Sequence, residues 1–508
     1  MTESLPLDGE SLSLEQLLAV VRGGCPVSLT PEARNRVAAS RRVVERAVGA
    51  GRTIYGVTTG FGSLSDRAIP ASEARALQLS LVRSHSSGTG PALSPDLVRG
   101  LLLLRLNSLA AGHSGVRLEV VDLLVDLLNR QLVPFVPEQG SVGASGDLAP
   151  LAHVAYALIG EGAFVSRDGA VLPASEVLRE AGLAPLVLQE KEGVALINGT
   201  ALMTAYLALS VEDARSLLAA AEVAAAVSFD ALRGNPVALD DRLGEVRRSA
   251  EQRQEARILR TLLQRSGLAP ARGEVVGQDP YTLRCLPQVF ASVRLALGFA
   301  QRIVADEINA VTDNPVVFEG DEFLNGGNFH GQSLALALDT LGLAVHYLAA
   351  FSERRTARLV HPALNRGLPP FLAPHAGVSS GYMIPQYLAA ALVNENQTLV
   401  HPASASSLPT SADQEDFVSM GPWAGAKLRR ILSNTQKVVA VEWMVAAQAL
   451  ELRRPTAGGA GSEAALRTLR ELVAPWSTDR SPSAEIEAVA QRIADGSLVR
   501  RVRTEVPF

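Results

Sequence analysis

The feature that most constrains the fold is a set of long Ala- and Leu-rich segments in the second half of the chain, which contain few internal glycines or prolines. They predict five long helices, at residues 200–232, 286–311, 331–358, 384–400 and 424–452. Each is longer than the usual helix of about 11–12 residues, as in bundles whose helices run their whole height. Because the segments show no fixed repeat, a helical solenoid is disfavoured. We therefore expect a mainly α protein built on a long central helical bundle.

The first half of the chain has shorter and more varied elements. The sequence predicts helices at 31–50, 95–111 and 116–131, and a strand at 52–57. Two β-hairpins are indicated, one turning at Asp168-Gly169 and the other at Glu319-Gly320-Asp321. We expect a mixed, loop-rich N-terminal region over residues 1–195, followed by the long-helix bundle and a C-terminal helical tail over residues 196–508.

Composition narrows the possible partners. In 508 residues, 47% are hydrophobic, and the net charge of −5 comes with no basic block that would attract nucleic acid or an anionic membrane. The most apolar stretch, 201–232, contains too many charged residues to span a bilayer. Two cysteines cannot form a disulfide framework, and no CxxC or HExxH pattern indicates a metal site. With no signal peptide at the start, we expect a cytoplasmic protein without metal, nucleic-acid or membrane partners.

The segment most informative about chemistry is GSVGASGDLAPLAH, residues 140–153. A run of small residues ends just before Asp147, which is a good N-cap for the apolar run that follows, and Pro150 suits the first turn of a helix. A tight loop therefore leads into a helix N-terminus. On its own such a loop is typical of an ordinary turn, and the neighbouring motifs decide its meaning.

The loop resembles the signature of the aromatic amino-acid ammonia-lyase family, in which Ala-Ser-Gly cyclises into a 4-methylidene-imidazol-5-one prosthetic group. The resemblance extends along most of the chain, through TIYGVTTGFG at 53–62, SLVRSHSSG at 80–88, INGT at 197–200, GQDPYTLRC at 277–285, DNPVVF at 313–318, GGNFHG at 326–331 and LPTSADQEDFVSMG at 408–421. It implies that the Gly146 nitrogen attacks the Ala144 carbonyl, and that Ser145 loses its hydroxyl. Gly146 offers an unhindered nitrogen, and Ser145 supplies a hydroxyl that can leave. No external cofactor is implied.

The resemblance also assigns site residues. Eliminating ammonia from an α-amino acid requires an acceptor for the amine and a base for the β-proton. The prosthetic group is the implied acceptor and Tyr55 the implied base, while Arg284 resembles a clamp for the substrate carboxylate, a task suited to a planar guanidinium. The remaining implied residues position the substrate and the ring or form an aromatic wall: Asn198, Gln278, Tyr281 and Phe329.

Substrate preference is indicated by residues expected to face the substrate side chain. Ser84-His85 resembles the Ser-His pair of the histidine-acting members, and Glu415, after Gln414, resembles their carboxylate. A carboxylate and an imidazole can pair with the two nitrogens of a histidine side chain, which would be costly to bury unpaired. These residues predict deamination of L-histidine to trans-urocanate. Histidine-acting members usually have His where this chain has Phe417, so a tyrosine or phenylalanine ammonia-lyase, or a 2,3-aminomutase of the family, is the alternative.

Two hypotheses from other classes stay open at this point. A fumarase/aspartase-type lyase shares the long helical bundle but has no prosthetic group, and a catalytically inactive scaffold would need none of these residues. The presence of Tyr55, Ser145 and Arg284 together disfavours the scaffold. The predicted site residues are scattered along the chain, and the long helices are more apolar than one bundle needs, so we expect a homotetramer with active sites shared between subunits.

Overall fold

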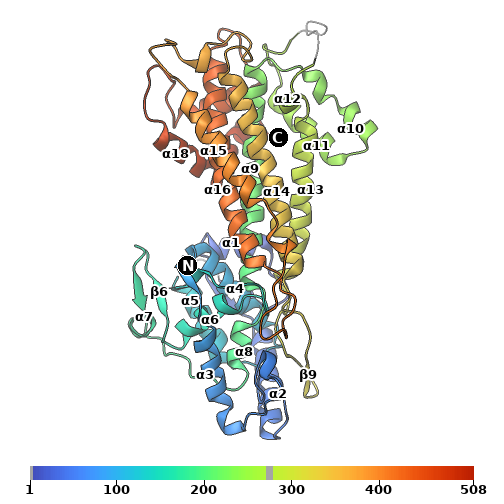
Figure 1. Cartoon of the computed structure of the whole chain (residues 1–508), viewed down its shortest axis with the longest axis vertical. Coiled ribbons are helices and arrows are strands. Elements are labelled where there is room, and N and C mark those ends of the chain that lie inside the picture. The colour runs from blue at the N-terminus through green and yellow to red at the C-terminus, as the bar shows by residue number, and fades with distance from the viewer. Residues whose placement is uncertain (1–3, 271–277) are drawn as a thin grey trace. The chain divides into compact units, whose positions relative to one another are not determined.

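A computed structural model describes residues 4–270 and 278–508 (Figure 1). It divides into two compact units, each assembled from separate stretches of the chain. Unit 1 comprises residues 1–209, 301–338 and 403–426, and unit 2 comprises residues 210–300, 339–402 and 427–508. The boundary predicted at residue 195 divides the chain once, whereas these units are discontinuous.

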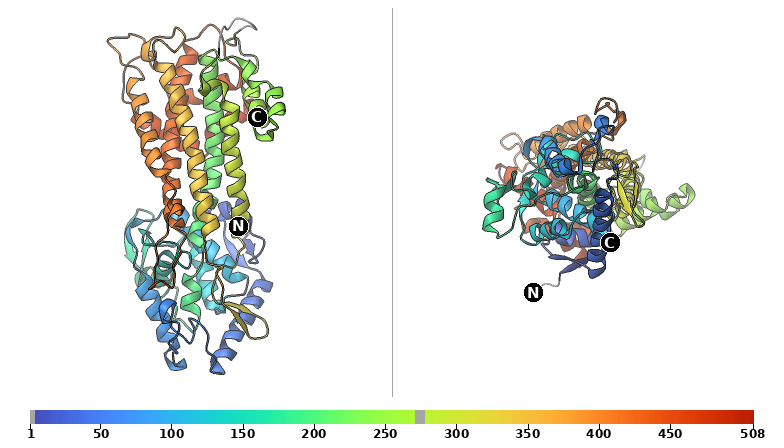
Figure 2. Two further views of the ribbon diagram at one scale, coloured as in Figure 1. Left: turned by 45° about the vertical axis from the view of Figure 1, so that its right-hand side comes forward. Right: turned by 90° about the horizontal axis from the view of Figure 1, so that it is seen from below.

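The five predicted long helices are present, each starting within three residues of the predicted position. They are α9 (Ala201–Ala231), α13 (Leu286–Glu307), α14 (Gln332–Val360), α15 (Met383–Leu399) and α16 (Gly421–Glu451). In unit 2 they run side by side as a bundle, which Figure 1 and the left view of Figure 2 show. The expectation of a mainly helical protein built on a long bundle is confirmed.

Shorter helices complete unit 2. They are α10 (Asp241–Arg247), α11 (Ala250–Leu262), α12 (Tyr281–Arg284), α17 (Ala460–Arg470), α18 (Ser483–Ala494) and α19 (Ser497–Glu505). The bundle core is aliphatic, with Trp443 fully buried in it. One ion pair is also fully buried there: Arg355 donates to both carboxylate oxygens of Glu442, at 2.6 and 2.8 Å. Ser228 donates to the same carboxylate, so this buried charge has its partners.

Among the described residues, α14 is the one helix that is long and apolar enough to cross a membrane by length and composition. Within its most apolar window, 61% of the residues are buried inside the protein. Core helices of globular proteins have the same character, so this helix alone is weak evidence for a membrane span.

Unit 1 is built from shorter helices. They are α1 (Leu14–Val21), α2 (Pro31–Gly49), α3 (Ala74–His85), α4 (Pro95–Ala110), α5 (Leu118–Asn129), α6 (Leu148–Leu158), α7 (Ala174–Glu180) and α8 (Glu192–Ile197). The helices predicted at 31–50, 95–111 and 116–131 correspond to α2, α4 and α5. Helix α4 is buried on nearly every side and forms the centre of the unit.

The strands of unit 1 are short. Strand β1 (Leu5–Leu7) pairs in parallel with β2 (Val27–Leu29), and β3 (Thr89–Ala92) pairs antiparallel with β5 (Pro137–Gln139). Both predicted hairpins are present: β6 (Ala163–Val165) with β7 (Val171–Pro173), to which β4 (Val133–Pro134) adds, and β8 (Val316–Phe318) with β9 (Glu322–Leu324).

The strand predicted at 52–57 is wrong, because this segment forms a turn. The threonines that follow it bond back to its main chain: Ile54 N donates to Thr58 Oγ1 at 2.8 Å, and Gly56 N donates to Thr59 Oγ1 at 3.1 Å. Gly56 also has a φ of +66°, which a continuing strand does not allow. Local side-chain bonds of this kind compete with strand pairing. The turn directs Tyr55 toward a cavity.

Candidate active site

Unit 1 contains a half-open cavity of about 820 Å³ that is lined by residues from distant parts of the chain. Of the residues predicted to form the site, seven line it: Tyr55, His85, Ser145, Asn198, Phe329, Gln414 and Glu415. Ala144 lines a smaller neighbouring cavity of about 200 Å³, which shares Ser84, His85 and Leu148 with the first. The motifs quoted above therefore meet in one place, although the residues between them span most of the chain.

The Ala144-Ser145-Gly146 loop is sharply bent. Ser145 and Gly146 have φ values of +46° and +82°, and Gly143 just before them has +84°. A Cβ on residue 146 would lie 2.1 Å from the main-chain oxygen of Gly199, so only glycine fits there. A non-glycine residue in the left-handed region is uncommon, and at Ser145 it places the side chain at the cavity wall. The loop thus combines a bent backbone, an unhindered glycine nitrogen and a serine hydroxyl, which are the groups that the cyclisation requires.

The residue after the loop, Asp147, does not have the predicted role. It precedes α6, but its side chain makes no bond to that helix. Its Oδ2 instead accepts from the backbone nitrogens of Leu202 and Met203, at 2.7 and 3.2 Å, at the start of α9. Asp147 therefore caps a helix that begins more than fifty residues later and ties the loop to it. Full burial raises the pKa of Asp147 to about 7, and the two N–H bonds oppose that shift.

Asn198 lies at the end of α8, on the side of the cavity next to the bent loop. Its side-chain nitrogen donates to the main-chain oxygen of Asn314 at 2.7 Å, which fixes the amide. The following residue, Gly199, donates its N–H to Ser145 O at 3.1 Å and accepts from Asp147 N at 2.7 Å. The chain at 198–200 is thus bonded directly to the loop that carries Ser145.

Tyr55 faces the cavity from the turn at 54–59. Its hydroxyl oxygen accepts a hydrogen bond from Gly62 N at 3.1 Å, which holds the phenol in place. The loop that contains Gly62 in turn meets the loop at 410–415, where Ser63 N donates to Ser411 Oγ at 3.4 Å. Two of the predicted motifs therefore support each other at the cavity wall.

His85 and Glu415 both line the cavity. Burial lowers the pKa of His85, while a bond to the Leu81 carbonyl and the charge of Glu415 act in the opposite direction. The imidazole is 3.0 Å from Ser84 Oγ through its Nδ1. Glu415 is held by Thr410, whose hydroxyl donates to Glu415 Oε2 at 2.8 Å. A neutral imidazole and a carboxylate are therefore available to polar groups of a ligand.

Phe417, where the chain departs from the pattern of histidine-acting relatives, does not line the cavity. Its side chain is 57% exposed and stacks on His330, with the ring centroids 6.0 Å apart. The main-chain oxygen of Phe417 is also 3.2 Å from His330 Nε2. In this chain Phe417 packs against the GGNFHG segment, and the wall of the cavity is formed by its neighbours Gln414 and Glu415.

Three predicted site residues lie in unit 2 and do not line this cavity. Gln278 and Tyr281 are exposed, with 65% of Tyr281 accessible. The guanidinium of Arg284 lies over the Tyr281 ring, 4.5 Å from its centroid, and Arg284 Nε is buried without a partner. In the QDPYTLR motif the guanidinium of Arg284 and the ring of Tyr281 therefore lie side by side.

Several residues without a predicted role also line the cavity. Asn314 lines it and carries the oxygen that holds Asn198. Leu77, Leu81 and Leu148 supply apolar wall. Their sequence signal is weak, because leucine on a helix usually belongs to the core, and Asn314 lies in the DNPVVF motif without an implied role.

Within residues 4–270 and 278–508, no group of three or more His, Cys, Asp and Glu side chains is arranged to hold a metal ion.

Comparison with known proteins identifies the family. The sequence profile described as aromatic amino acid lyase matches residues 12–471. The chain belongs to this family. It is 49% identical over 495 residues to histidine ammonia-lyase of Symbiobacterium thermophilum, covering 97% of each chain, and 47% identical over 508 residues to that of Sorangium cellulosum, covering 98% of this chain and 99% of the relative.

Solved structures of family members agree with the fold. Tyrosine aminomutase from Streptomyces globisporus is 37% identical and superimposes with a TM-score of 0.94, covering 100% of this chain and 99% of its own. Histidine ammonia-lyase from Trypanosoma cruzi is 38% identical with a TM-score of 0.91, covering 99% and 96%. This member of the aromatic amino acid lyase family is a carbon–nitrogen lyase, and the predicted family is confirmed.

Proposed function

We propose that this lyase eliminates ammonia from L-histidine to give trans-urocanate. The observation that carries the proposal is the presence of both His85 and Glu415 on the wall of the cavity that also holds Ser145. Histidine presents two ring nitrogens, and a cavity with a neutral imidazole and a carboxylate can satisfy both. The relatives named histidine ammonia-lyase support the same substrate.

The prosthetic group would form from Ala144, Ser145 and Gly146. The bent backbone at Ser145 and Gly146, and the tight packing of Gly146 against Gly199, fit such a ring. When formed, it supplies an electrophile that draws electrons from the amine and makes nitrogen a better leaving group. Asn198, bonded to Asn314, would position the substrate beside it.

The protein's own residues would carry the remaining chemistry. In the overall reaction the Cβ–H and Cα–N bonds break, a carbon–carbon double bond forms, and the nitrogen leaves as ammonia. We assign to Tyr55 the removal of the β-proton, since its hydroxyl is fixed at the cavity wall by Gly62 N. Glu415 would bind the substrate imidazole, with Phe329 as the aromatic wall.

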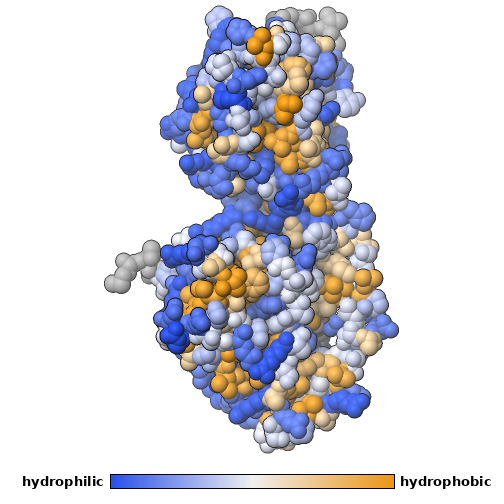
Figure 3. Space-filling model, turned by 60° about the vertical axis from the view of Figure 1, so that its left-hand side comes forward, coloured by the Kyte–Doolittle hydropathy of each residue, from blue (hydrophilic) through white to orange (hydrophobic). Residues whose placement is uncertain are grey.

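The substrate carboxylate needs a cationic partner. Arg67 lines the cavity of a single chain, but its side chain is 75% exposed and lies 3.9 Å from the carboxylate of Asp66. We propose that Arg284, with Tyr281 and Gln278, comes from another copy in a homotetramer. Helices α13, α14 and α15 expose large apolar side chains that a second copy would cover: Leu295, Leu336, Leu343, Tyr347, Ile384, Tyr387 and Leu388. Figure 3 shows apolar residues gathered in several places on one face of the molecule. Among the described residues Cys25 and Cys285 form no disulfide, which fits a reducing cytoplasm.

One experiment tests substrate and prosthetic group together. Purified protein is assayed by ultraviolet absorbance against L-histidine, L-tyrosine and L-phenylalanine, with product analysis for β-amino acids, and its intact mass is measured. We expect turnover of histidine and a mass below that of the sequence by two waters, about 36 Da. Formation of a β-amino acid would identify an aminomutase instead. An intact mass equal to that of the unmodified sequence would exclude the ring.

A further inference from the structure

Behind the cavity wall, unit 1 contains a buried charge cluster formed by Arg105, Lys191 and Asp313. The side chains of Lys191 and Asp313 are fully buried, and that of Arg105 is 1% exposed. Lys191 Nζ lies 2.8 Å from Asp313 Oδ2, and Arg105 Nη2 lies 4.0 Å from the same oxygen. Two cations thus share one carboxylate. Burying three charges is costly unless each is paired. A buried cluster of two cations and one carboxylate therefore suggests a role beyond stability.

Arg105 joins the cluster to the end of α8. Its Nη1 donates to Asn198 O at 2.6 Å, and its Nη2 donates to Ala195 O. These are carbonyls at the C-terminus of a helix, which lack partners within the helix. Arg105 also packs against the next residue, since a Cβ on Gly199 would lie 2.9 Å from Arg105 Nη1. The guanidinium therefore fixes the main chain on both sides of Asn198.

Asp313 holds the segment that binds the side-chain amide of Asn198. Its Oδ1 accepts from Asn314 N at 2.7 Å, and Asn314 O accepts from Asn198 Nδ2 at 2.7 Å. The backbone of Asn198 is thus held by Arg105, and its side chain by a segment that Asp313 holds. Both anchors belong to one charge cluster that does not line the cavity.

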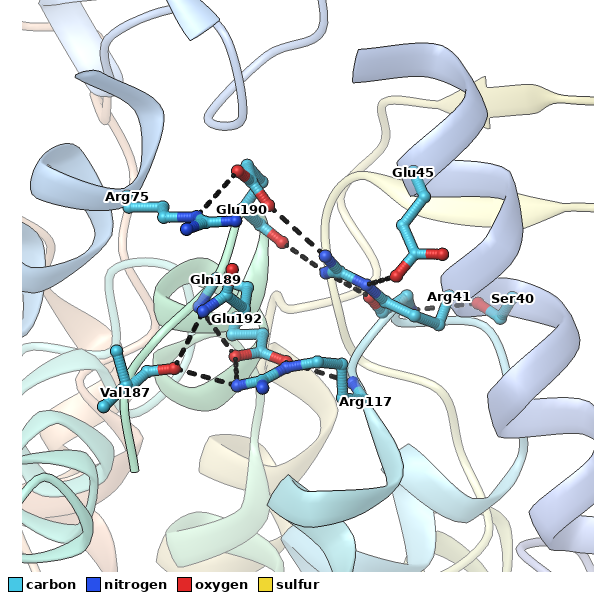
Figure 4. A network of polar contacts seen from close by, with 10 residues as sticks. Ser40, Arg41, Glu45, Arg75, Arg117, Val187, Gln189, Glu190 and Glu192 are labelled. Atoms are coloured by element: carbon cyan, nitrogen blue, oxygen red, sulfur yellow. Dashed lines mark hydrogen bonds and ion pairs between the residues drawn. The ribbon is translucent and has the colours of Figure 1, made fainter. Parts of the chain in front are cut away.

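The residues on either side of Lys191, Glu190 and Glu192, are held by three arginines, as Figure 4 shows. Arg41 from α2 and Arg75 from α3 pair with Glu190 at 3.3 and 3.2 Å. Arg117 pairs with the buried carboxylate of Glu192 at 2.8 Å. Both neighbours are held by arginines, Lys191 has a φ of +74°, and its Nζ donates to Asp313 Oδ2.

We propose that Arg105 is a positioning residue for Asn198 and Gly199, and that Asp313 and Lys191 support it. The alternative is a purely structural ion cluster, such as Lys427 with Asp339 in unit 2, also buried and 3.0 Å apart. The two differ in what the cation touches. Lys427 bonds to Asp339 and to the carbonyl of His401, whereas the Arg105 cluster bonds to the main chain of a cavity residue. This inference rests on the proposed function, because Asn198 acts there on the substrate.

The test compares Arg105→Met, Arg105→Lys and Lys191→Met with the matched control Lys427→Met. The melting temperature, the fraction of chains lacking two waters, and kcat and KM for L-histidine are measured for each. kcat is expressed per chain that carries the ring. It should fall about 10²-fold in Arg105→Met and about 10-fold in Lys191→Met, while KM changes less than about threefold. This pattern is expected when Asn198 is no longer held in the reactive position. Arg105→Lys keeps the charge and should recover part of kcat.

Lys191→Met keeps the experiment informative if Arg105→Met does not fold, because it leaves Arg105 and Asp313 as one neutral pair. A folded variant that fails to form the ring, and so shows no mass deficit of two waters, also supports the proposal. Gly199 N bonds directly to Ser145 O, so a displaced Gly199 would disturb the loop that cyclises. Loss of melting temperature equal to that of Lys427→Met, with wild-type kcat per ring-bearing chain, would overturn it. Failure of the proposed function is recognised separately, since the wild type would then show no mass deficit or no histidine turnover.

Discussion

The bundle of unit 2 and the cavity of unit 1 are stabilised in different ways. The bundle consists of long regular helices around an aliphatic core, and its buried ion pair joins Arg355 and Glu442, which both belong to the bundle. The cavity is formed by short helices and loops, whose positions depend on side-chain bonds across the sequence, such as Asp147 to Leu202. The comparison indicates that the bundle should tolerate substitution with a loss of stability alone, whereas the cavity should lose activity first.

The largest expected effect is at Ser145. Ser145→Ala removes the hydroxyl that must leave when the ring forms, so activity should fall at least about 10³-fold while helical circular dichroism stays that of the wild type. The variant should also keep the two waters, which intact mass measures. Ser166→Ala, in a solvent-facing turn of the β6–β7 hairpin, is the matched control and should retain both activity and the mass deficit. Near-normal turnover by Ser145→Ala would contradict the assignment.

The next largest effect concerns Asp147 and pH. Its pKa rises from 3.8 to about 7 on folding, so between these values the folded state binds more protons than the unfolded state, and the unfolding free energy falls as pH increases. Asp147→Asn keeps the shape and an acceptor oxygen but does not titrate. In denaturant titrations from pH 4 to 8, the unfolding free energy of the wild type should fall by about 4 kcal/mol at most as pH rises, and that of the variant should not show this fall.

Asp168→Asn provides a control of opposite sign. Bonds from Ser166 hold the pKa of Asp168 below its usual value, so the wild-type residue stabilises the fold as pH rises through the acid range. Its substitution should therefore lower stability at neutral pH relative to acid. Parallel pH profiles for wild type and Asp147→Asn would contradict the buried, titrating carboxyl.

A cavity-forming substitution in the bundle tests the other side of the comparison. Leu348, on α14 in unit 2, is fully buried, and Leu348→Ala should lower the unfolding free energy by about 2–5 kcal/mol. Leu243→Ala, at a side chain that is 44% exposed on α10, should change it far less. Below the unfolding transition, kcat of both should stay within about twofold of wild type, because neither touches the cavity. A large drop in kcat for Leu348→Ala would show that bundle and cavity are coupled.

The smallest expected effect is on substrate preference. Glu415→Gln keeps size but loses charge, and should lower kcat/KM for histidine about 10- to 10²-fold, the equivalent of one charge-assisted hydrogen bond. Any side activity on phenylalanine should survive or increase. Thr410→Val, which removes the hydroxyl that holds Glu415, should have a smaller effect in the same direction. Unchanged histidine turnover in Glu415→Gln would point to another determinant of preference.

The difference between the two regions also decides what could be predicted from sequence. The predicted ends of helix α9 are within one residue of the observed ones, because an Ala- and Leu-rich run without glycine or proline defines a helix locally. The segment at 52–57 was wrong, since strand-like residues there were overridden by bonds from Thr58 and Thr59. Propensity therefore sufficed where the structure is regular and failed where side chains compete for the backbone.

For the site, family motifs indicated residues that the fold brings together, including Tyr55, Ser145 and Glu415. The partners of those residues could not be predicted. Lys191 and Asp313 are more than a hundred positions apart, and nothing local to either shows that they pair. Asp147 was assigned to the helix beside it, but its carboxylate caps one that starts at Ala201. Likewise, Arg284 is not among the residues that line the cavity within one chain, and no local sequence signal indicates which copy would supply it.

The contacts around Ser145 also imply an order of events during folding. Ser145 is bonded to Gly199, and Asp147, just after the bend, is bonded to Gly199, Leu202 and Met203, none of which is near in sequence. Closing a loop of this length comes after local helices form, because its entropic cost is repaid only when the distant contacts are made. The tripeptide therefore reaches its bent shape late, when α6 and the start of α9 have already met. A nascent or truncated chain that ends before Gly199 and the start of α9 would carry Ala144, Ser145 and Gly146 but would not cyclise them.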